Sequence, residues 1–147
     1  CSLKQICMAV FYHFNDVRVP LHQRRRLGTF LGQVFADHGR KLRRLDYVFC
    51  DDAFLLDINQ QYLHHDTYTD IITFSLDDDS SGLAGEIYIS VDRVRENAAK
   101  FGVRFEEELH RVIFHGVLHL CGFGDKKAGE KKIMRQKENE LLERYFN

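Results

Sequence analysis

The sequence predicts an α+β fold: a small central four-stranded mixed sheet packed with about five helices. Four short segments rich in β-branched and aromatic residues are typical of strands. Longer segments between and after them carry apolar residues at helical spacing. Strands and helices are mixed but do not alternate regularly, which favours α+β, with α/β as the alternative.

The first half of the chain is expected to contribute two strands and two helices. Residues 6–14 and 45–50 are predicted strands because aromatic and β-branched side chains dominate both segments. Between them, residues 21–38 carry an apolar stripe of helical period, and Gly39 suits the position just after a helix end. A short helix over residues 51–62 follows, with an aspartate as its N-cap.

The second half is expected to contribute the other two strands, over residues 71–76 and 85–90, joined by an acidic loop over residues 77–82. Three helices then complete the chain, over about residues 90–102, 105–120 and 128–146. The middle helix is the most hydrophobic, so we expect it to be the most buried.

Length and composition place limits on the class of protein. The 147 residues suit one domain, 1–147, and no apolar run is long enough to span a membrane. The net charge of −1 means that any nucleic-acid binding must use a local basic face. The first residues do not resemble a signal peptide, and the four cysteines form no CxxC pair. We therefore expect a cytoplasmic protein with reduced cysteines.

The strongest chemical feature is the segment His115-Gly-Val-Leu-His119, which is followed by Gly122 and Asp125. Histidines four residues apart lie on one face of a helix. Gly122 is expected to end that helix in a left-handed conformation, which turns Asp125 back toward the histidines. The three side chains are therefore predicted to bind one metal ion.

Two imidazoles and one carboxylate suit Zn²⁺, and three protein ligands leave a fourth position for water or substrate. That open position is typical of a catalytic site and favours an enzyme. The alternative is that the histidines are ordinary core or surface residues. A metallopeptidase of the H-E-x-x-H kind is disfavoured, because Gly116 stands where its general base would be.

At these residues the sequence resembles the YbeY family of bacterial metal-dependent endoribonucleases. The segment from His115 to Asp125 matches the family motif H-G-x-L-H-L-x-G-[aromatic]-D-H. Two further matches are Asn59-Gln-Gln-Tyr-Leu-His-His-Asp-Thr-Tyr-Thr-Asp-Ile-Ile-Thr-Phe74 and Gly85-Glu-Ile-Tyr-Ile-Ser90. The resemblance covers about residues 45–145.

The resemblance implies a cytoplasmic, metal-dependent endoribonuclease that acts on single-stranded RNA. Together with the ligand set, it predicts one Zn²⁺ ion per chain. It also implies the maturation of the 3′ end of small-subunit ribosomal RNA, ribosome quality control and contact with the small ribosomal subunit. The fold that it implies is the α+β fold predicted above. This sequence departs from the family pattern at Asp125, where the family has histidine, and at Leu63, where it has arginine.

Basic residues directly after the metal motif are candidates for RNA contact. Lys126, Lys127 and Lys131 follow the metal motif directly and are candidate RNA contacts. The alternative is a solvated helix face balanced by acidic residues, namely Glu138, Glu140 and Glu143. Asp70 is the candidate proton acceptor, so the predicted catalytic residues are His115, His119 and Asp70.

Three other histidines are expected to play no part. His64 and His65 are predicted to lie in an exposed loop, and His110 to lie at the surface, away from the metal face. Thr69 is read either as a turn residue or as a residue that supports the site.

Two further functions remain open. The protein is either an endoribonuclease or a non-catalytic RNA-binding ribosome-assembly factor in which a structural metal ties the last helix to the core. A metallopeptidase is the third and least favoured alternative.

Overall fold

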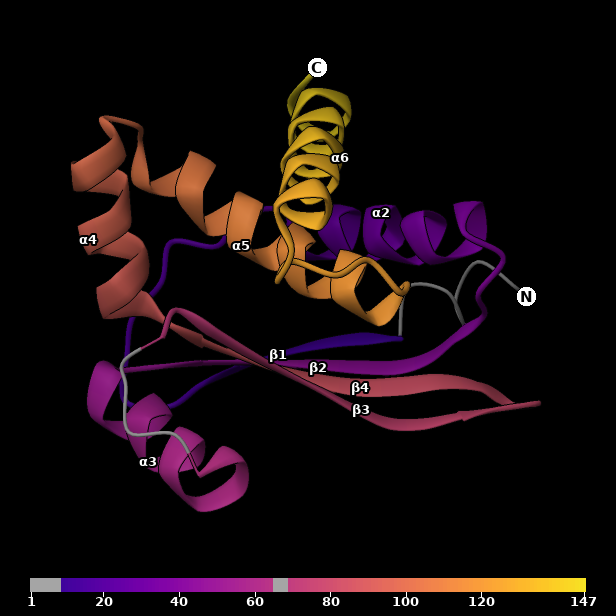
Figure 1. Cartoon of the computed structure of the whole chain (residues 1–147), viewed down its shortest axis with the longest axis horizontal. Coiled ribbons are helices and arrows are strands. Elements are labelled where there is room, and N and C mark those ends of the chain that lie inside the picture. The colour runs from indigo at the N-terminus through magenta and orange to yellow at the C-terminus, as the bar shows by residue number, and fades with distance from the viewer. Residues whose placement is uncertain (1–8, 65–68) are drawn as a thin grey trace.

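The structure is a computed structural model that describes residues 9–64 and 69–147 (Figure 1). Cys1, Cys7, His65, Asp66 and the start of the first predicted strand lie outside these residues. No helix in the described ranges is both long enough and apolar enough to cross a membrane.

Four strands form one mixed sheet, as predicted, in the order β1-β2-β4-β3. They are β1 (Val10–Phe14), β2 (Leu42–Cys50), β3 (Ile71–Asp79) and β4 (Gly82–Ser90). β1 pairs parallel with β2, β2 pairs parallel with β4, and β3 pairs antiparallel with β4. Among the described strands, β3 is therefore an edge strand.

The acidic segment 77–82 is not the loop that the sequence predicts. Residues 77–79 pair with residues 82–84 of β4, and the turn is confined to residues 80 and 81. Arg40 and Arg43 bind Asp78 and Asp77 at N–O distances of 2.6 and 3.0 Å. A strand tolerates these aspartates because they lie at the exposed end of the sheet, beside Arg40 and Arg43.

Five helices pack around the sheet in the described part of the chain. They are α2 (Arg24–Asp37), α3 (Asp52–Leu63), α4 (Val91–Phe101), α5 (Phe105–Leu120) and α6 (Ala128–Phe146). In Figure 1, α2, α5 and α6 lie on one face of the sheet and α3 lies on the other. α4 stands beside the first half of α5 and packs against it.

Two helices begin where the sequence places a capping side chain. The Asp51 carboxylate accepts a hydrogen bond from the Phe54 N–H at 2.8 Å, and the Ser90 hydroxyl accepts one from the Arg93 N–H at 3.2 Å. Each cap satisfies a backbone donor that has no partner within its own helix. These caps fix where α3 and α4 start.

The main core lies between the sheet and the helices that cover its first face. Leu109, Ile113 and Val117 of α5 are fully buried against sheet residues such as Ile87. Each side chain of this size contributes about 1.5–3 kcal/mol when it is buried. The Tyr47 hydroxyl also donates a hydrogen bond to the Ile113 carbonyl at 2.9 Å. These contacts fix the rotation of α5 and so decide which of its side chains face outward.

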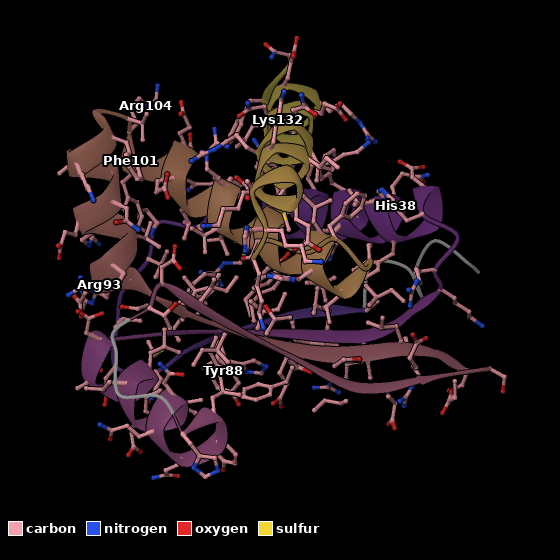
Figure 2. The ribbon with its side chains drawn as sticks, viewed as in Figure 1. His38, Tyr88, Arg93, Phe101, Arg104 and Lys132 are labelled. Atoms are coloured by element: carbon pink, nitrogen blue, oxygen red, sulfur yellow. The ribbon has the colours of Figure 1, made fainter. Side chains whose placement is uncertain are left out.

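A smaller apolar cluster lies under α3 on the opposite face of the sheet. It contains Cys50, Leu55 and Ile72, with Tyr88 packed at its side (Figure 2). Burial raises the pKa of the Cys50 thiol to about 12 and that of Cys121 to about 11. Both described cysteines, Cys50 and Cys121, are free thiols.

Candidate metal centre and its groove

His115 and His119 lie on the same face of α5, because residues four apart in a helix are neighbours. Their ring centroids are 4.9 Å apart. The opposite face of α5 packs on the sheet, so both imidazoles point away from the core and remain partly exposed. The sequence prediction that they form a pair is consistent with this geometry.

The turn after α5 returns the chain toward the two histidines. Gly122 has a φ of 104°, a conformation that favours glycine. Its N–H donates to the His119 carbonyl at 3.0 Å, and the Phe123 N–H donates to the Leu118 carbonyl at 3.0 Å. The Phe123 ring packs edge-on against His38, the residue just after α2, which anchors the loop.

Asp125 meets both histidines at the end of this loop. Its Oδ2 lies 3.1 Å from Nε2 of His115 and 3.2 Å from Nε2 of His119. Burial raises the pKa of the Asp125 carboxyl, but His119 and His115 lower it more, so the pKa lies below its ordinary value. The carboxylate therefore stays ionised, as a metal ligand must.

These three residues fit a small divalent cation. One ligand atom from each lies within 4.8 Å of the others, and all three side chains are partly exposed. Within the described ranges, no fourth His, Cys, Asp or Glu joins the group. Two nitrogens and one oxygen suit Zn²⁺ in an open site, whereas a structural zinc site is normally closed by four protein ligands.

Glu138 is buried beside the candidate metal ligands, although the sequence places it on a helix face that could be solvated. It was expected on a solvated face of the last helix, but it is only 5% exposed. His115 donates a hydrogen bond from Nδ1 to Glu138 Oε2 at 2.7 Å. Arg111 donates to the other oxygen at 3.1 Å. Glu138 therefore holds the His115 ring and leaves its Nε2 directed at the site.

The pKa of His115 reflects these neighbours. Burial lowers this pKa, but the hydrogen bond and charge of Glu138, together with Asp125 and Asp70, raise it above its ordinary value. A signal for Glu138 was present in the sequence. It lies on the same helical stripe as Met134, Leu141 and Tyr145, which are all buried.

The candidate metal centre opens into a groove with a volume of about 1040 Å³. Side chains of α4, α5 and α6, the first residues of β3, and two residues of α3 line it. The two α3 residues are Asn59 and Leu63, and Thr69 also lines the groove before β3. This volume exceeds what a metal ion and a single phosphate need.

Two further carboxyls lie in the groove, one of them not anticipated. Asp70, the predicted proton acceptor, lines it, and burial raises the pKa of Asp70 although the charge of His115 opposes the rise. Glu108 of α5 is only 5% exposed, and burial raises the pKa of its carboxyl too. A carboxyl with a raised pKa is better matched to proton transfer near neutral pH.

The groove also has basic side chains. Of the three lysines predicted to contact RNA, Lys126 and Lys131 line it, whereas Lys127 is not among the lining residues. Arg111 and Arg135 line it as well. The groove is therefore mixed in charge, with cations beside the candidate metal ligands.

The prediction that His110 lies at the surface is wrong. Its exposure is 2%, and its ring stacks on Tyr145 with centroids 5.4 Å apart. His110 donates a hydrogen bond from Nδ1 to the Glu106 carbonyl at 2.8 Å. The prediction failed because α6 covers this side of α5, and helical phase alone cannot show where a later helix packs.

Gly116 faces the sheet and not the groove. A Cβ at this position would lie 2.7 Å from Ile87 Cδ1 and 3.1 Å from Ile71 Cδ1. Glycine is therefore required for α5 to approach the sheet closely. A glutamate cannot be accommodated here, which supports the sequence argument against an H-E-x-x-H peptidase.

Sequence comparisons match this chain to one family of known proteins. A family model described as "Endoribonuclease YbeY" matches residues 21–146. A relative with that description from Bacteroides thetaiotaomicron is 45% identical over 135 residues, which are 92% of this chain and 98% of the relative. Another from Flavobacterium psychrophilum is 51% identical over 116 residues, which are 78% of this chain and 81% of the relative.

A solved structure confirms the fold. The solution structure of TM1509 from Thermotoga maritima superposes with a TM-score of 0.60 at 25% identity. The match covers 93% of this chain and 89% of that one. The predicted α+β fold with a four-stranded mixed sheet and five helices is thereby confirmed.

Proposed function

Because the chain belongs to the YbeY endoribonuclease family, we propose that it is a zinc-dependent endoribonuclease specific for single-stranded RNA. One observation carries the proposal. The atoms of His115, His119 and Asp125 lie within 4.8 Å of one another at the edge of a groove lined by basic side chains. We assign these three residues as the ligands of one Zn²⁺ ion.

A zinc ion held there supplies a Lewis acid and lowers the pKa of a bound water. The protein's own groups supply the rest of the reaction. Arg111, Arg135, Lys126 and Lys131 bind phosphates of the strand and compensate the charge that develops on the phosphoryl oxygens. Asp70 accepts a proton from the attacking water, and the raised pKa of its carboxyl suits that role.

Hydrolysis adds the elements of water across one P–O bond of the strand. The water oxygen bonds to phosphorus, one sugar oxygen leaves, and that oxygen takes up a proton. Glu138 keeps His115 in the tautomer with Nδ1 protonated, so that Nε2 is available to the metal. Lys127, although predicted to bind RNA, is assigned a weaker role because it does not line the groove.

Family membership extends the proposal to the biological substrate. We propose ribosomal RNA, with maturation of the 3′ end of the small-subunit RNA and ribosome quality control as the processes served. The partner is then the small ribosomal subunit, and the location is the cytoplasm. A precursor RNA that carries an unprocessed 3′ end is the substrate on which to test this part.

The test compares cleavage of single-stranded RNA, double-stranded RNA and a peptide by the metal-loaded protein. We expect cleavage of single-stranded RNA only. Chelation and His119→Ala should each abolish it, and added Zn²⁺ should restore it to the chelated wild type. Asp70→Asn should lower kcat at least tenfold while Zn²⁺ stays bound. His22→Ala, at an exposed position, is the matched control.

Other outcomes would identify the alternatives. RNA binding with a full metal content and no cleavage would favour the ribosome-assembly factor with a structural metal. Peptide cleavage that is lost in His119→Ala would favour the metallopeptidase. Cleavage of RNA that persists unchanged in His119→Ala would come from a contaminating nuclease and would contradict the assignment.

A further inference from the structure

The groove extends well beyond the candidate metal centre. Its floor follows one face of α5, from His119 and His115 through Arg111 to Glu108. His115 is ten residues from the first residue of α5, which is roughly 15 Å along the helix axis. Asn97 and Phe101 of α4 form the wall at this far end. None of the roles assigned above uses that end of the groove.

Phe101 is unusually placed for a phenylalanine. It is the last residue of α4, next to the turn into α5 (Figure 2). It is 53% exposed although it lines the groove. None of the aromatic ring pairs among the described residues includes Phe101, and the Lys100 ammonium lies 5.9 Å from its ring centroid. The ring therefore offers apolar surface to the groove, and most of it is not used for packing in the core.

The chemistry beside Phe101 suits a nucleobase. Asn97 lies one helical turn earlier on the same side of α4 and lines the same groove. An amide can both donate to and accept from the edge of a base. A flat apolar ring, a neighbouring amide and a nearby ammonium are the groups with which proteins hold an unpaired nucleotide.

The charges along the rest of the groove favour a nucleic-acid strand over an apolar segment of another protein. Charged side chains, among them Arg111, Glu108 and Arg135, line the groove between the metal centre and Phe101. An apolar helix or strand laid along the groove would have to desolvate these charges. A nucleic-acid strand instead places phosphates and sugars over the charged floor and needs an apolar partner only where a base turns inward.

We propose that Phe101 and Asn97 form a nucleobase subsite, in which the Phe101 ring stacks on one unpaired base of the RNA strand. The base lies a few nucleotides from the phosphate bound at the candidate metal centre. The subsite binds any base by stacking, and the Asn97 amide adds a hydrogen bond to the base edge. This inference rests on the proposed function, because it takes the strand in the groove to be RNA.

The first test measures the affinity for a fluorescent single-stranded RNA with chelator present, so that no cleavage occurs. We expect Phe101→Ala to raise Kd about tenfold. Phe101→Tyr, which keeps the ring, should stay within about twofold of the wild type. Phe54→Ala is the matched control: it removes a partly exposed ring of α3 that does not line the groove.

A second probe separates stacking from a general change in the groove. An abasic strand of the same length keeps the phosphates and sugars but has no bases. The wild type and Phe101→Ala should bind this strand equally. If Phe101→Ala loses affinity equally for both strands, or for neither, the subsite is overturned. Photocrosslinking with 5-iodouridine at successive positions should attach the strand to the peptide that contains Phe101.

The two proposals fail in different ways. RNA that crosslinks to Phe101 but is not cleaved by the metal-loaded protein would support the subsite and contradict the nuclease activity. Cleavage with unchanged KM and binding in Phe101→Ala would support the nuclease activity and contradict the subsite. A protein that binds no single-stranded RNA would contradict both.

Discussion

Glu138 of α6 accepts a hydrogen bond from Nδ1 of His115 at 2.7 Å, so the last helix of the chain fixes the orientation of a candidate metal ligand on α5. A carboxylate can only accept, so Nδ1 of His115 carries a proton, and Nε2 is the nitrogen that faces the site. The carboxylate also makes the imidazole a stronger base. Arg111 holds the same carboxylate in place from the α5 side.

Replacing Glu138 should therefore weaken metal binding without removing a ligand. In Glu138→Gln we expect the Zn²⁺ affinity to fall by about 10- to 100-fold, because the amide cannot supply the negative charge. Competition with a chromogenic chelator measures this change. Glu140→Gln, on the exposed face of the same helix, is the control and should keep the wild-type affinity. Equal affinity in both variants would show that Glu138 has no influence on the site.

Asp125 should behave as an anionic ligand. Asp125→Asn removes the charge and should weaken Zn²⁺ binding more than tenfold, whereas Asp125→His should retain binding, because histidine is the residue of the family motif at this position. The metal content of the purified proteins and the rise in Tm on addition of Zn²⁺ test both expectations. If Asp125→Asn binds Zn²⁺ as tightly as the wild type, the third ligand lies elsewhere.

Gly116 should be required for the packing of α5 on the sheet. Gly116→Ala places a methyl group 2.7 Å from Ile87 Cδ1, so we expect a loss of about 1–3 kcal/mol in the free energy of unfolding. Gly129→Ala is the matched control, because apart from its own chain neighbours and helix backbone no atom lies within 4 Å of its added Cβ in α6. That variant should be neutral or more stable, since alanine favours helix. Urea denaturation compares the two variants, and equal stabilities would contradict the close contact at Gly116.

His110 should make the fold less stable in mild acid. Burial lowers the pKa of His110 below its ordinary value of 6.5, so the unfolded chain takes up this proton first as the pH falls. The contribution of His110 is complete above about pH 6.5 and is lost as the pH falls toward the pKa of the folded state.

The pH dependence of urea denaturation, with chelator present, measures this loss. Between about pH 7.5 and pH 5, the wild type should lose more stability than His110→Gln. His22→Gln, at an exposed position, should follow the wild type. A wild type and a His110→Gln variant with identical pH dependence would contradict the argument.

Local spacing in the sequence was sufficient for several features. The strands were identified by their β-branched and aromatic residues, the helices by their apolar periods, and an aspartate N-cap for the helix that Asp51 begins by residue type. The pairing of His115 with His119 and the positive φ of Gly122 were predicted for the same reason. Each of these depends on residues only a few positions apart, where the geometry of the backbone fixes the distance.

Only the tertiary structure decided the surroundings of this site. Glu138 and His115 are 23 residues apart in the chain, and their contact exists because α6 packs across α5. The same packing buries His110, and the fold brings Asp70 of the β3 segment and Phe101 of α4 to one groove. A residue's own type and spacing do not reveal which distant element will cover it. The sequence by itself therefore determined the three candidate ligands. The packing of α4, α6 and β3 around α5 decided what surrounds them, because those contacts come from the burial of apolar surface between distant segments.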